Sequence, residues 1–290
     1  MKTIKVSVGI FCHNEEDNIG RALTSVVNSK TEIALIEEIV VVSSGSFDRT
    51  NRIIRQFARK DKRIVLIDEA ERKGKSSAIN LFLHAAHGEV LVSMSGDLKL
   101  KNDAIEEIAL PFLNSEVGMA GGHPVPMNAR FSSVGKEAAL MWQLHHQISL
   151  RQPKCGEMVA FRNVIRKIPV QSAVDEANLE VLLRMVGFSI IYAPRSIIYN
   201  KVPGNLAQLL LQRRRVHAGH LWLADKYNYT VSTMQQDKIL PAVFDYFSEH
   251  PQEIATLFRL VSIEMCAWFL GWFDYTVLGK NPFKWQMVKR

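Results

Sequence analysis

The sequence places a carboxylate on a turn directly after an apolar run, in the order Ser95-Gly96-Asp97. The preceding residues, 89–94, are expected to form a buried strand. In open α/β sheets, ligands bind outside the carboxyl ends of the strands. A single aspartate there can hold Mg²⁺, whose sites often combine one or two carboxylates with phosphate oxygens of the substrate. Aspartate is also a common turn former, so a purely structural role for Asp97 is the alternative.

Two further carboxylates, Asp175 and Glu176, stand side by side at the start of an expected helix over residues 175–186. Either of them could accept the proton of an attacking hydroxyl group. The alternative is the ordinary preference for acidic residues at a helix N-terminus. Lys75 lies at the start of another expected helix, 75–86, where backbone N–H groups already favour anions. A solvated surface lysine is the alternative for Lys75.

Polar residues also follow two other expected strands. Asn14 and Glu15 follow strand 4–11, and Ser43 and Ser44 follow strand 38–42. Right-handed crossovers would bring these turns to the same edge of the sheet as Ser95 and Asp97. These polar turns are what a ligand-binding edge of the sheet would carry. The alternative is helix capping by Asn14 or Ser46.

Short apolar runs alternate with helical patterns through the first half of the chain. This alternation predicts an α/β fold with a mostly parallel central sheet flanked by helices. The second half is more irregular and ends in a long helical region. In addition to the elements already given, the pattern predicts strands at 63–67, 118–122, 157–161 and 188–192, and helices at 15–28, 48–60, 131–150, 205–226 and from about 237 to 278.

Taken in order, these motifs resemble those of family 2 glycosyltransferases, which have the GT-A fold and transfer sugars from nucleotide donors. The resemblance covers roughly residues 4–220. Ser95-Gly96-Asp97 stands at the Asp-x-Asp position of the family. The other matching segments are 6–16 (the first strand and a Tyr-Asn-Glu-type turn), 41–48 (the Asp-Asp-Gly-Ser-x-Asp turn), 72–80 (the Gly-Lys segment), 156–162 (the acceptor-side strand), 174–179 (the Thr-Glu-Asp position) and 212–216 (the Gln-x-x-Arg-Trp motif).

The resemblance implies an inverting glycosyltransferase that moves a sugar from a nucleotide-diphosphate donor to a hydroxyl or phosphate of an acceptor. Asp97 would hold Mg²⁺ or Mn²⁺, and Glu176 would align with the base of the family, with Asp175 before it. Arg213 and Arg214 are expected to face solvent or lipid headgroups. The residues expected to bind donor or acceptor are Asn14, Glu15, Ser43, Ser44, Lys75, Ser95, Gly156, Gln212 and Arg215.

The resemblance also predicts the organisation of the chain. Residues 1–228 would form the GT-A domain, with the nucleotide-sugar half at about 1–122 and the acceptor half at 123–228. Residues 229–290 would form a helical C-terminal region that associates with a membrane.

Several positions depart from the family pattern. Ser95 replaces the first aspartate of Asp-x-Asp, Ser43 and Ser44 replace an aspartate pair, Glu176 replaces an aspartate, and Val216 replaces a tryptophan. These changes keep a second function open: a catalytically degenerate GT-A-like module that binds nucleotides and docks on a membrane or a partner.

Charge and composition restrict the partners of the chain. The 290 residues carry a net charge of +7, which favours an anionic partner, and 22% charged with 47% hydrophobic residues argues against global disorder. The basic residues do not alternate with aromatics as a nucleic-acid stacking platform requires, so no nucleic acid is expected. The three cysteines show neither disulfide nor zinc spacing, and no secretory signal is apparent, so we expect a cytoplasmic location.

The C-terminal segment 254–273 is strongly apolar, but Arg259 and Glu264 interrupt it, which argues against a simple membrane span. Aromatic residues crowd segment 268–275. This pattern, with the basic residues that follow, is typical of a helix lying at the cytoplasmic face of a membrane, and it favours a lipid-linked or glycan acceptor. The alternative is a core helix or a helix that mediates a homo-oligomer. The basic residues are Lys280, Lys284, Lys289 and Arg290.

Overall fold

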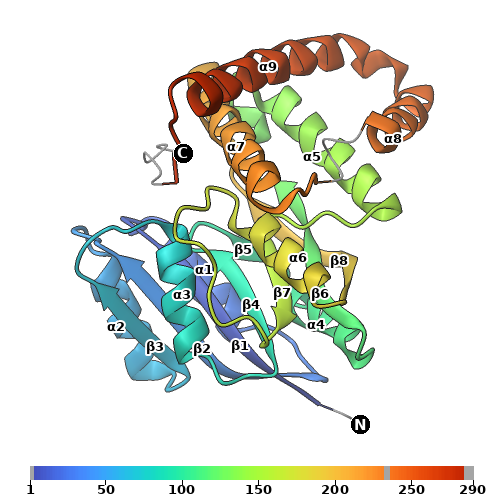
Figure 1. The fold of residues 1–290 in the computed structure, drawn as a ribbon. Helices are drawn as coiled ribbons and strands as arrows, with labels where there is room; N and C mark the ends of the chain where they lie inside the picture. Colours follow the sequence, from blue (N-terminus) through green and yellow to red (C-terminus); the bar gives the residue numbers. More distant parts are fainter. Residues whose placement is uncertain (1–2, 232–235, 284–290) are drawn as a thin grey trace.

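The computed structural model describes residues 3–231 and 236–283, which form an α/β fold around an eight-stranded sheet (Figure 1). The strand order is β3-β2-β1-β4-β7-β6-β8-β5, and four of the seven strand pairings are parallel. The expected α/β class with a mostly parallel sheet is therefore confirmed. The parallel half comprises β1 (Ile4–Cys12), β2 (Ala34–Ser44), β3 (Ile64–Glu69) and β4 (Val90–Ser95).

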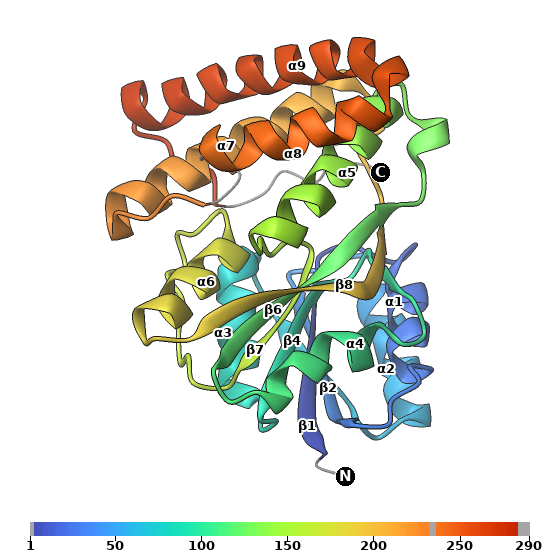
Figure 2. The same cartoon turned by 90° about the vertical axis from the view of Figure 1, so that its right-hand side faces the viewer.

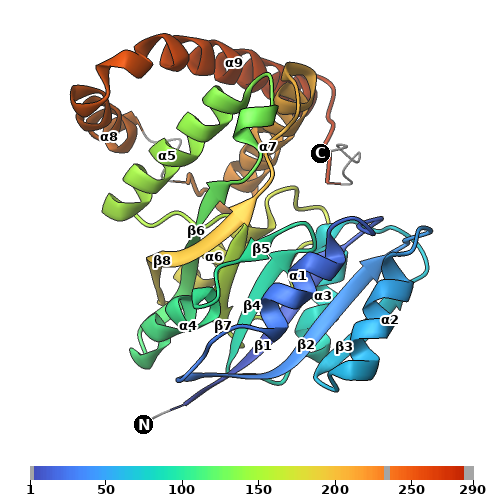
Figure 3. The same ribbon diagram turned by 180° about the vertical axis from the view of Figure 1, so that it is seen from behind.

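Helices cover both faces of this sheet, which explains why β1 and β4 are apolar along almost their whole length. The apolar side chains of α1 repeat at Ile19, Leu23 and Val26 and pack into the core on one face. Phe82 of α3 lies in a second core cluster on the other face. Figures 1 and 3 show the two faces. One face carries α1 (Ile19–Val27), α2 (Thr50–Lys60) and α4 (Ala104–Ala109), and the other carries α3 (Lys75–Ala85) and α6 (Asp175–Met185).

The other half of the sheet is mixed in direction. It comprises β5 (Lys99–Leu100), β6 (Val117–Pro126), β7 (Met158–Arg162) and β8 (Ser189–Asn200). The expected strands at 118–122 and 188–192 are thus parts of longer ones. The register of β6 with β7 ends at Gly121, and beyond it β6 pairs with β8 alone. Proline is tolerated where one side of a strand has no partner, which explains how Pro124 and Pro126 belong to β6.

Above the carboxyl ends of the parallel strands lies a layer of helices (Figure 2). Its members are α5 (Gly135–Arg151), α7 (Leu206–Tyr227), α8 (Gln236–Glu249) and α9 (Ile254–Trp272), followed by a π-helical turn at Phe273–Val277. Gly271 of α9 allows close packing on α7, because a Cβ atom there would lie 2.6 Å from the carbonyl oxygen of Arg214. Short 3₁₀ turns lie at Leu110–Leu113, Ala129–Phe131 and Pro251–Glu253.

Candidate active site

The register of the sheet brings the predicted polar turns together. Phe11 of β1 is opposite Ser95 of β4, and Cys12 is opposite Ser43 of β2. The segments that follow these strands therefore leave the sheet at one edge, as the sequence predicted. A cavity of about 880 Å³ opens there and extends to the overlying helices.

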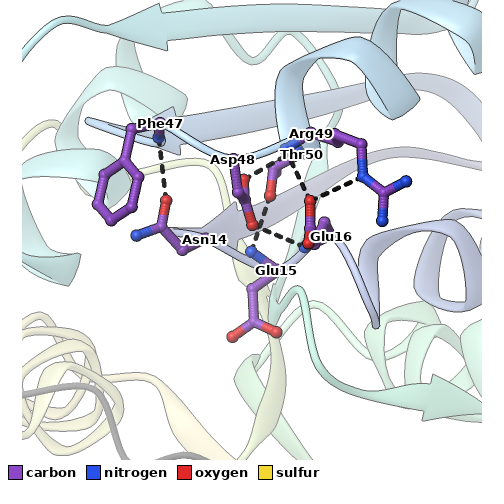
Figure 4. A network of polar contacts seen from close by, with 7 residues as sticks. All are labelled: Asn14, Glu15, Glu16, Phe47, Asp48, Arg49 and Thr50. Atoms are coloured by element: carbon purple, nitrogen blue, oxygen red, sulfur yellow. Dashed lines mark hydrogen bonds and ion pairs between the residues drawn. The ribbon is translucent and has the colours of Figure 1, made fainter.

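The loops after β1 and β2 are tied together by hydrogen bonds, which Figure 4 shows in part. The backbone N–H of Asn14 donates to the hydroxyl of Ser46 over 3.0 Å, and the Asn14 side chain accepts from the N–H of Phe47 over 3.0 Å. These two hydrogen bonds join the loops. Neither Asn14 nor Ser46 is the N-cap residue of the helix that follows it. Asn14 has a φ of 52°, a left-handed conformation that asparagine tolerates. The carboxylate of Glu15 points away from this network (Figure 4), and Glu15 lines the cavity.

The two serines at the end of β2 form hydrogen bonds that hold the turn after the strand. Ser43 is fully buried, and its hydroxyl donates to Ser46 over 2.8 Å. Ser44 lines the cavity, while its hydroxyl donates to the carboxylate of Glu69. Gly45 follows with a φ of 63°, and a Cβ atom there would lie 2.7 Å from the backbone nitrogen of Arg72. The backbone of this turn can approach the 71–72 segment this closely only because residue 45 is glycine.

Ser95 and Asp97 both line the cavity. Gly96 lets the turn that carries them lie close to the end of β1. Its N–H donates to the carbonyl of Phe11 over 2.8 Å, and a Cβ atom at residue 96 would lie 2.9 Å from Cβ of Cys12. The described residues contain no cluster of three or more histidine, cysteine or acidic side chains that could hold a metal ion. A divalent cation at Asp97 would therefore need donor phosphate oxygens and water as its other ligands, an arrangement that suits Mg²⁺ or Mn²⁺.

Lys75 joins the two predicted base candidates. Its ammonium group lies 2.8 Å from Asp175 and 2.7 Å from Glu176, with 14% of the lysine side chain exposed. Glu176 lines the cavity, whereas Asp175 is only 2% exposed. The carboxylate of Glu176 is thus the one that an acceptor in the cavity can reach.

The pKa values of the two carboxylates move in opposite directions. Burial, followed by repulsion from Glu176, raises the pKa of Asp175 to about 6. Burial alone would also raise the pKa of Glu176, but the charge and hydrogen bond of Lys75 hold that pKa below its usual value. Glu176 is therefore ionised at neutral pH, as a proton acceptor must be.

The remaining predicted residues line the far side of the same cavity. Gly156 lies just before β7, and a Cβ atom there would sit 3.7 Å from Nε2 of His145. Gln212 and Arg215 come from α7, and Arg215 is only 9% exposed. The structure thus brings the predicted site residues to one cavity, except that Ser43 and Asp175 are buried and do not line it. Their roles stay predictions.

Several cavity residues were not identified as site residues from the sequence. Arg72 lines the cavity, and burial lowers the pKa of its guanidinium group. Lys154 and His220 also line it, and neither belongs to a recognisable motif. Arg213 and Arg214 were expected to face solvent or lipid, but both form ion pairs within the protein. Arg213 contacts Glu264 over 2.6 Å, and Arg214 contacts Asp274, because α9 and the turn that follows it cover this side of α7.

Comparison with solved structures supports the same fold class. The mannosyltransferase PcManGT from Pyrobaculum calidifontis, solved in complex with GDP-Man and Mn²⁺, superimposes with a TM-score of 0.64. It is 20% identical, and the match covers 97% of this chain and 78% of that one. At this level of identity the likeness establishes a GT-A-type fold.

The sequence itself defines the family. The family model for glycosyl transferase family 2 matches residues 7–162, more than half of the chain. The chain belongs to glycosyl transferase family 2.

Two curated relatives illustrate the breadth of the family. The probable glycosyltransferase YdaM of Bacillus subtilis (strain 168) is 24% identical over 260 residues, which cover 84% of this chain. The poly-beta-1,6-N-acetyl-D-glucosamine synthase of Staphylococcus epidermidis is 24% identical over 242 residues, which cover 79% of it. The matches cover 61% and 58% of those relatives, so this chain spans about three fifths of their length.

Proposed function

We propose that the protein is an inverting glycosyltransferase that uses a nucleotide-diphosphate sugar and a divalent cation. The observation that carries this proposal is the carboxylate of Glu176, which lies 2.7 Å from the ammonium group of Lys75 in the same cavity as Asp97. The division of labour follows the sequence prediction: residues 1–122 bind the donor, and residues 123–228 bind the acceptor.

In the proposed reaction, an acceptor hydroxyl attacks the anomeric carbon as the bond to the nucleoside diphosphate breaks. The hydroxyl proton passes to Glu176, and the bonding electrons leave with the diphosphate. Asp97 would hold Mg²⁺ or Mn²⁺, which would neutralise the charge that develops on the leaving group. The Mn²⁺ and GDP-Man bound by the Pyrobaculum mannosyltransferase support this choice of donor class and metal.

A panel of UDP- and GDP-sugars, assayed for nucleotide release with and without Mn²⁺, tests the proposal. The expected result is metal-dependent release of one nucleoside diphosphate, with inversion at the anomeric carbon of the product. Tight nucleotide binding without turnover of any donor would instead favour the degenerate binding module, which Ser95 in place of an aspartate keeps as the alternative.

We also infer that α9 lies on the cytoplasmic face of a membrane, where a lipid-linked or glycan acceptor would be found. Both charges of α9 are paired: Glu264 contacts Arg213 and His217 of α7, and Arg259, whose side chain is 65% exposed, contacts Glu137 of α5 over 3.1 Å. Its large apolar side chains are largely exposed. They include Ile254, Phe258, Val261, Met265, Trp268 and Phe269 and, in the following turn, Phe273 and Val277.

We call these exposed side chains the apolar stripe. A contiguous set of exposed apolar side chains on a folded protein marks an interaction site. Among the described residues, one helical stretch, Pro251–Val277, is long and apolar enough to cross a membrane, with a mean hydropathy of 1.5. The two charges within α9 are paired with α5 and α7, which favours a helix that lies on the bilayer. The net charge of +7 favours an anionic surface, and the three free cysteines fit the cytoplasm.

Sedimentation with anionic liposomes tests this surface. Replacement of Phe258 and Met265, both 68% exposed, by serine should abolish pelleting, whereas Met185→Ser, at 71% exposure on α6, should not. An intact protein that ignores the liposomes contradicts the membrane inference. Self-association that disappears in the Phe258/Met265 variant would show instead that the stripe joins copies of the chain.

A further inference from the structure

One carboxylate of the cavity comes from the strand next to Ser95. β4 and β7 are neighbours in the sheet (Figure 1), and Met94 of β4 is opposite Met158, the first residue of β7. Because the two strands are antiparallel, the next residues along them, Ser95 at the end of β4 and Glu157 just before β7, lie at the same edge of the sheet. Both residues line the cavity, and so does Asp97.

The backbone at Glu157 has a conformation that few residues adopt. Its φ is 60°, and the N–H of Met158 donates to the carbonyl of Gly156 over 2.7 Å, so Glu157 is the central residue of a tight three-residue turn. A left-handed conformation costs a non-glycine residue about 1–3 kcal/mol. Glycine would avoid that cost, so the turn itself does not call for a glutamate.

Asn200, the last residue of β8, binds this glutamate from below the cavity wall. Asn200 is 1% exposed, and its Nδ2 donates to Oε1 of Glu157 over 3.2 Å. The Oδ1 atom of the same buried amide has no hydrogen-bond partner among the described residues. A buried acceptor without a donor is costly, so a hydrogen-bond donor held beside Glu157 would be stabilised there.

Three other acidic side chains of the cavity form contacts within the loops after β1 and β2. Glu16 contacts Arg49 over 3.0 Å, and its N–H donates to Asp48 over 3.1 Å. Glu15 accepts from Nδ2 of Asn18 over 2.7 Å. These contacts lie on the β1 side of β4, whereas β7 flanks β4 on the other side.

We propose that Glu157 supplies the carboxylate that the chain lacks at Ser95. It would accept a hydrogen bond from water bound to the cation at Asp97, and so hold the hydrated cation against the donor diphosphate. A carboxylate has about four acceptor positions, so Glu157 can bind this water while its other contacts remain. This inference deepens the proposed function and rests on it, because it needs the divalent cation at Asp97.

Binding of Mn²⁺ to the full chain tests the proposal. The titration is made with saturating UDP or GDP and is followed by the EPR signal of the free ion. Glu157→Gln should weaken Mn²⁺ binding by about 10–100-fold, the usual cost of removing a group that binds the ligands of a metal. Glu116→Gln, at an exposed residue just before β6, is the matched control and should leave the affinity unchanged. An unchanged Mn²⁺ affinity of Glu157→Gln would overturn the assignment.

Nucleotide affinity without metal separates this role from a structural one. Because Glu157 would act through the cation, the Kd of Glu157→Gln for UDP or GDP in the presence of EDTA should equal that of the unmodified protein. A metal-free Kd that rises as much as the Kd for Mn²⁺ would show that Glu157 shapes the nucleotide site instead. An unmodified protein that binds nucleotide but no Mn²⁺ would contradict the metal-dependent function itself.

A second replacement tests whether Glu157 stands in for residue 95. Ser95→Asp adds a carboxylate at the end of β4, so the double variant Ser95→Asp/Glu157→Gln should recover most of the lost Mn²⁺ affinity. Such non-additive behaviour is expected of residues that act on one shared partner. A double variant that binds Mn²⁺ as weakly as Glu157→Gln alone would contradict the proposal.

Discussion

Replacement of Lys75 by methionine removes a cation that contacts both Asp175 and Glu176. Loss of one partner from a buried ion pair typically costs about 3–5 kcal/mol, because a charge is left in a poor environment. Asp175 can avoid part of this cost by binding a proton, since its pKa is already raised to about 6 in the presence of Lys75. The cost should therefore depend on pH.

The direction of this pH dependence follows from the raised pKa of Asp175. Below about pH 6 the folded protein holds Asp175 neutral, so Lys75 balances only Glu176 and its removal costs less. Above pH 6 both carboxylates are charged, and the full loss appears. We expect Lys75→Met to lower the free energy of unfolding by about 3 kcal/mol at pH 8 and by clearly less at pH 5.

Urea unfolding at pH 5, 6 and 8 measures this difference. Lys73→Met is the matched control, because Lys73 is exposed two residues away. Lys75→Arg keeps the charge and should retain most of the stability. A loss at pH 8 no larger than that of Lys73→Met, or the same loss at every pH, would refute the reasoning.

Three further predictions concern other parts of the fold and site. Glu264→Gln should lower the free energy of unfolding at pH 7 by about 3 kcal/mol, because Arg213 and His217 hold the pKa of Glu264 at about 2. That difference should shrink as pH falls from 4.5 towards 2, and a pH-independent loss would contradict it. Gly96→Ala should destabilise by about 1–3 kcal/mol in thermal unfolding, since its Cβ would lie 2.9 Å from that of Cys12. Asp97→Ala should abolish Mn²⁺-dependent nucleotide release, and full activity in this variant would remove Asp97 from the metal site.

The sequence was most informative about the parallel half of the sheet. Apolar runs such as residues 89–94 have the length and flanking turns of buried strands, and right-handed crossovers then bring their carboxyl ends together. The short elements β5 and α4, of two and six residues, were missed because they are too short to show a period. The proline-containing end of β6 was missed because proline ordinarily argues against a strand.

The candidate site could be predicted where a residue stood in an ordered motif. Asp97 and Glu176 are of this kind, and both line the cavity. The contact of Lys75 with Glu176 joins residues 101 positions apart, which no local pattern encodes. Lys154 was missed for the same reason, because only the packing of α5, α6 and α7 gives it a chemical setting.

The central claim is that Glu176 accepts a proton during sugar transfer, and Glu176→Gln tests it most directly. General-base catalysis contributes typically 10²–10⁴-fold to a rate. With the donor identified by the panel of nucleotide sugars, we expect kcat of Glu176→Gln to fall by about that factor while the Kd for the nucleotide with Mn²⁺ stays within about twofold. A kcat within a few-fold of the unmodified protein would contradict the account.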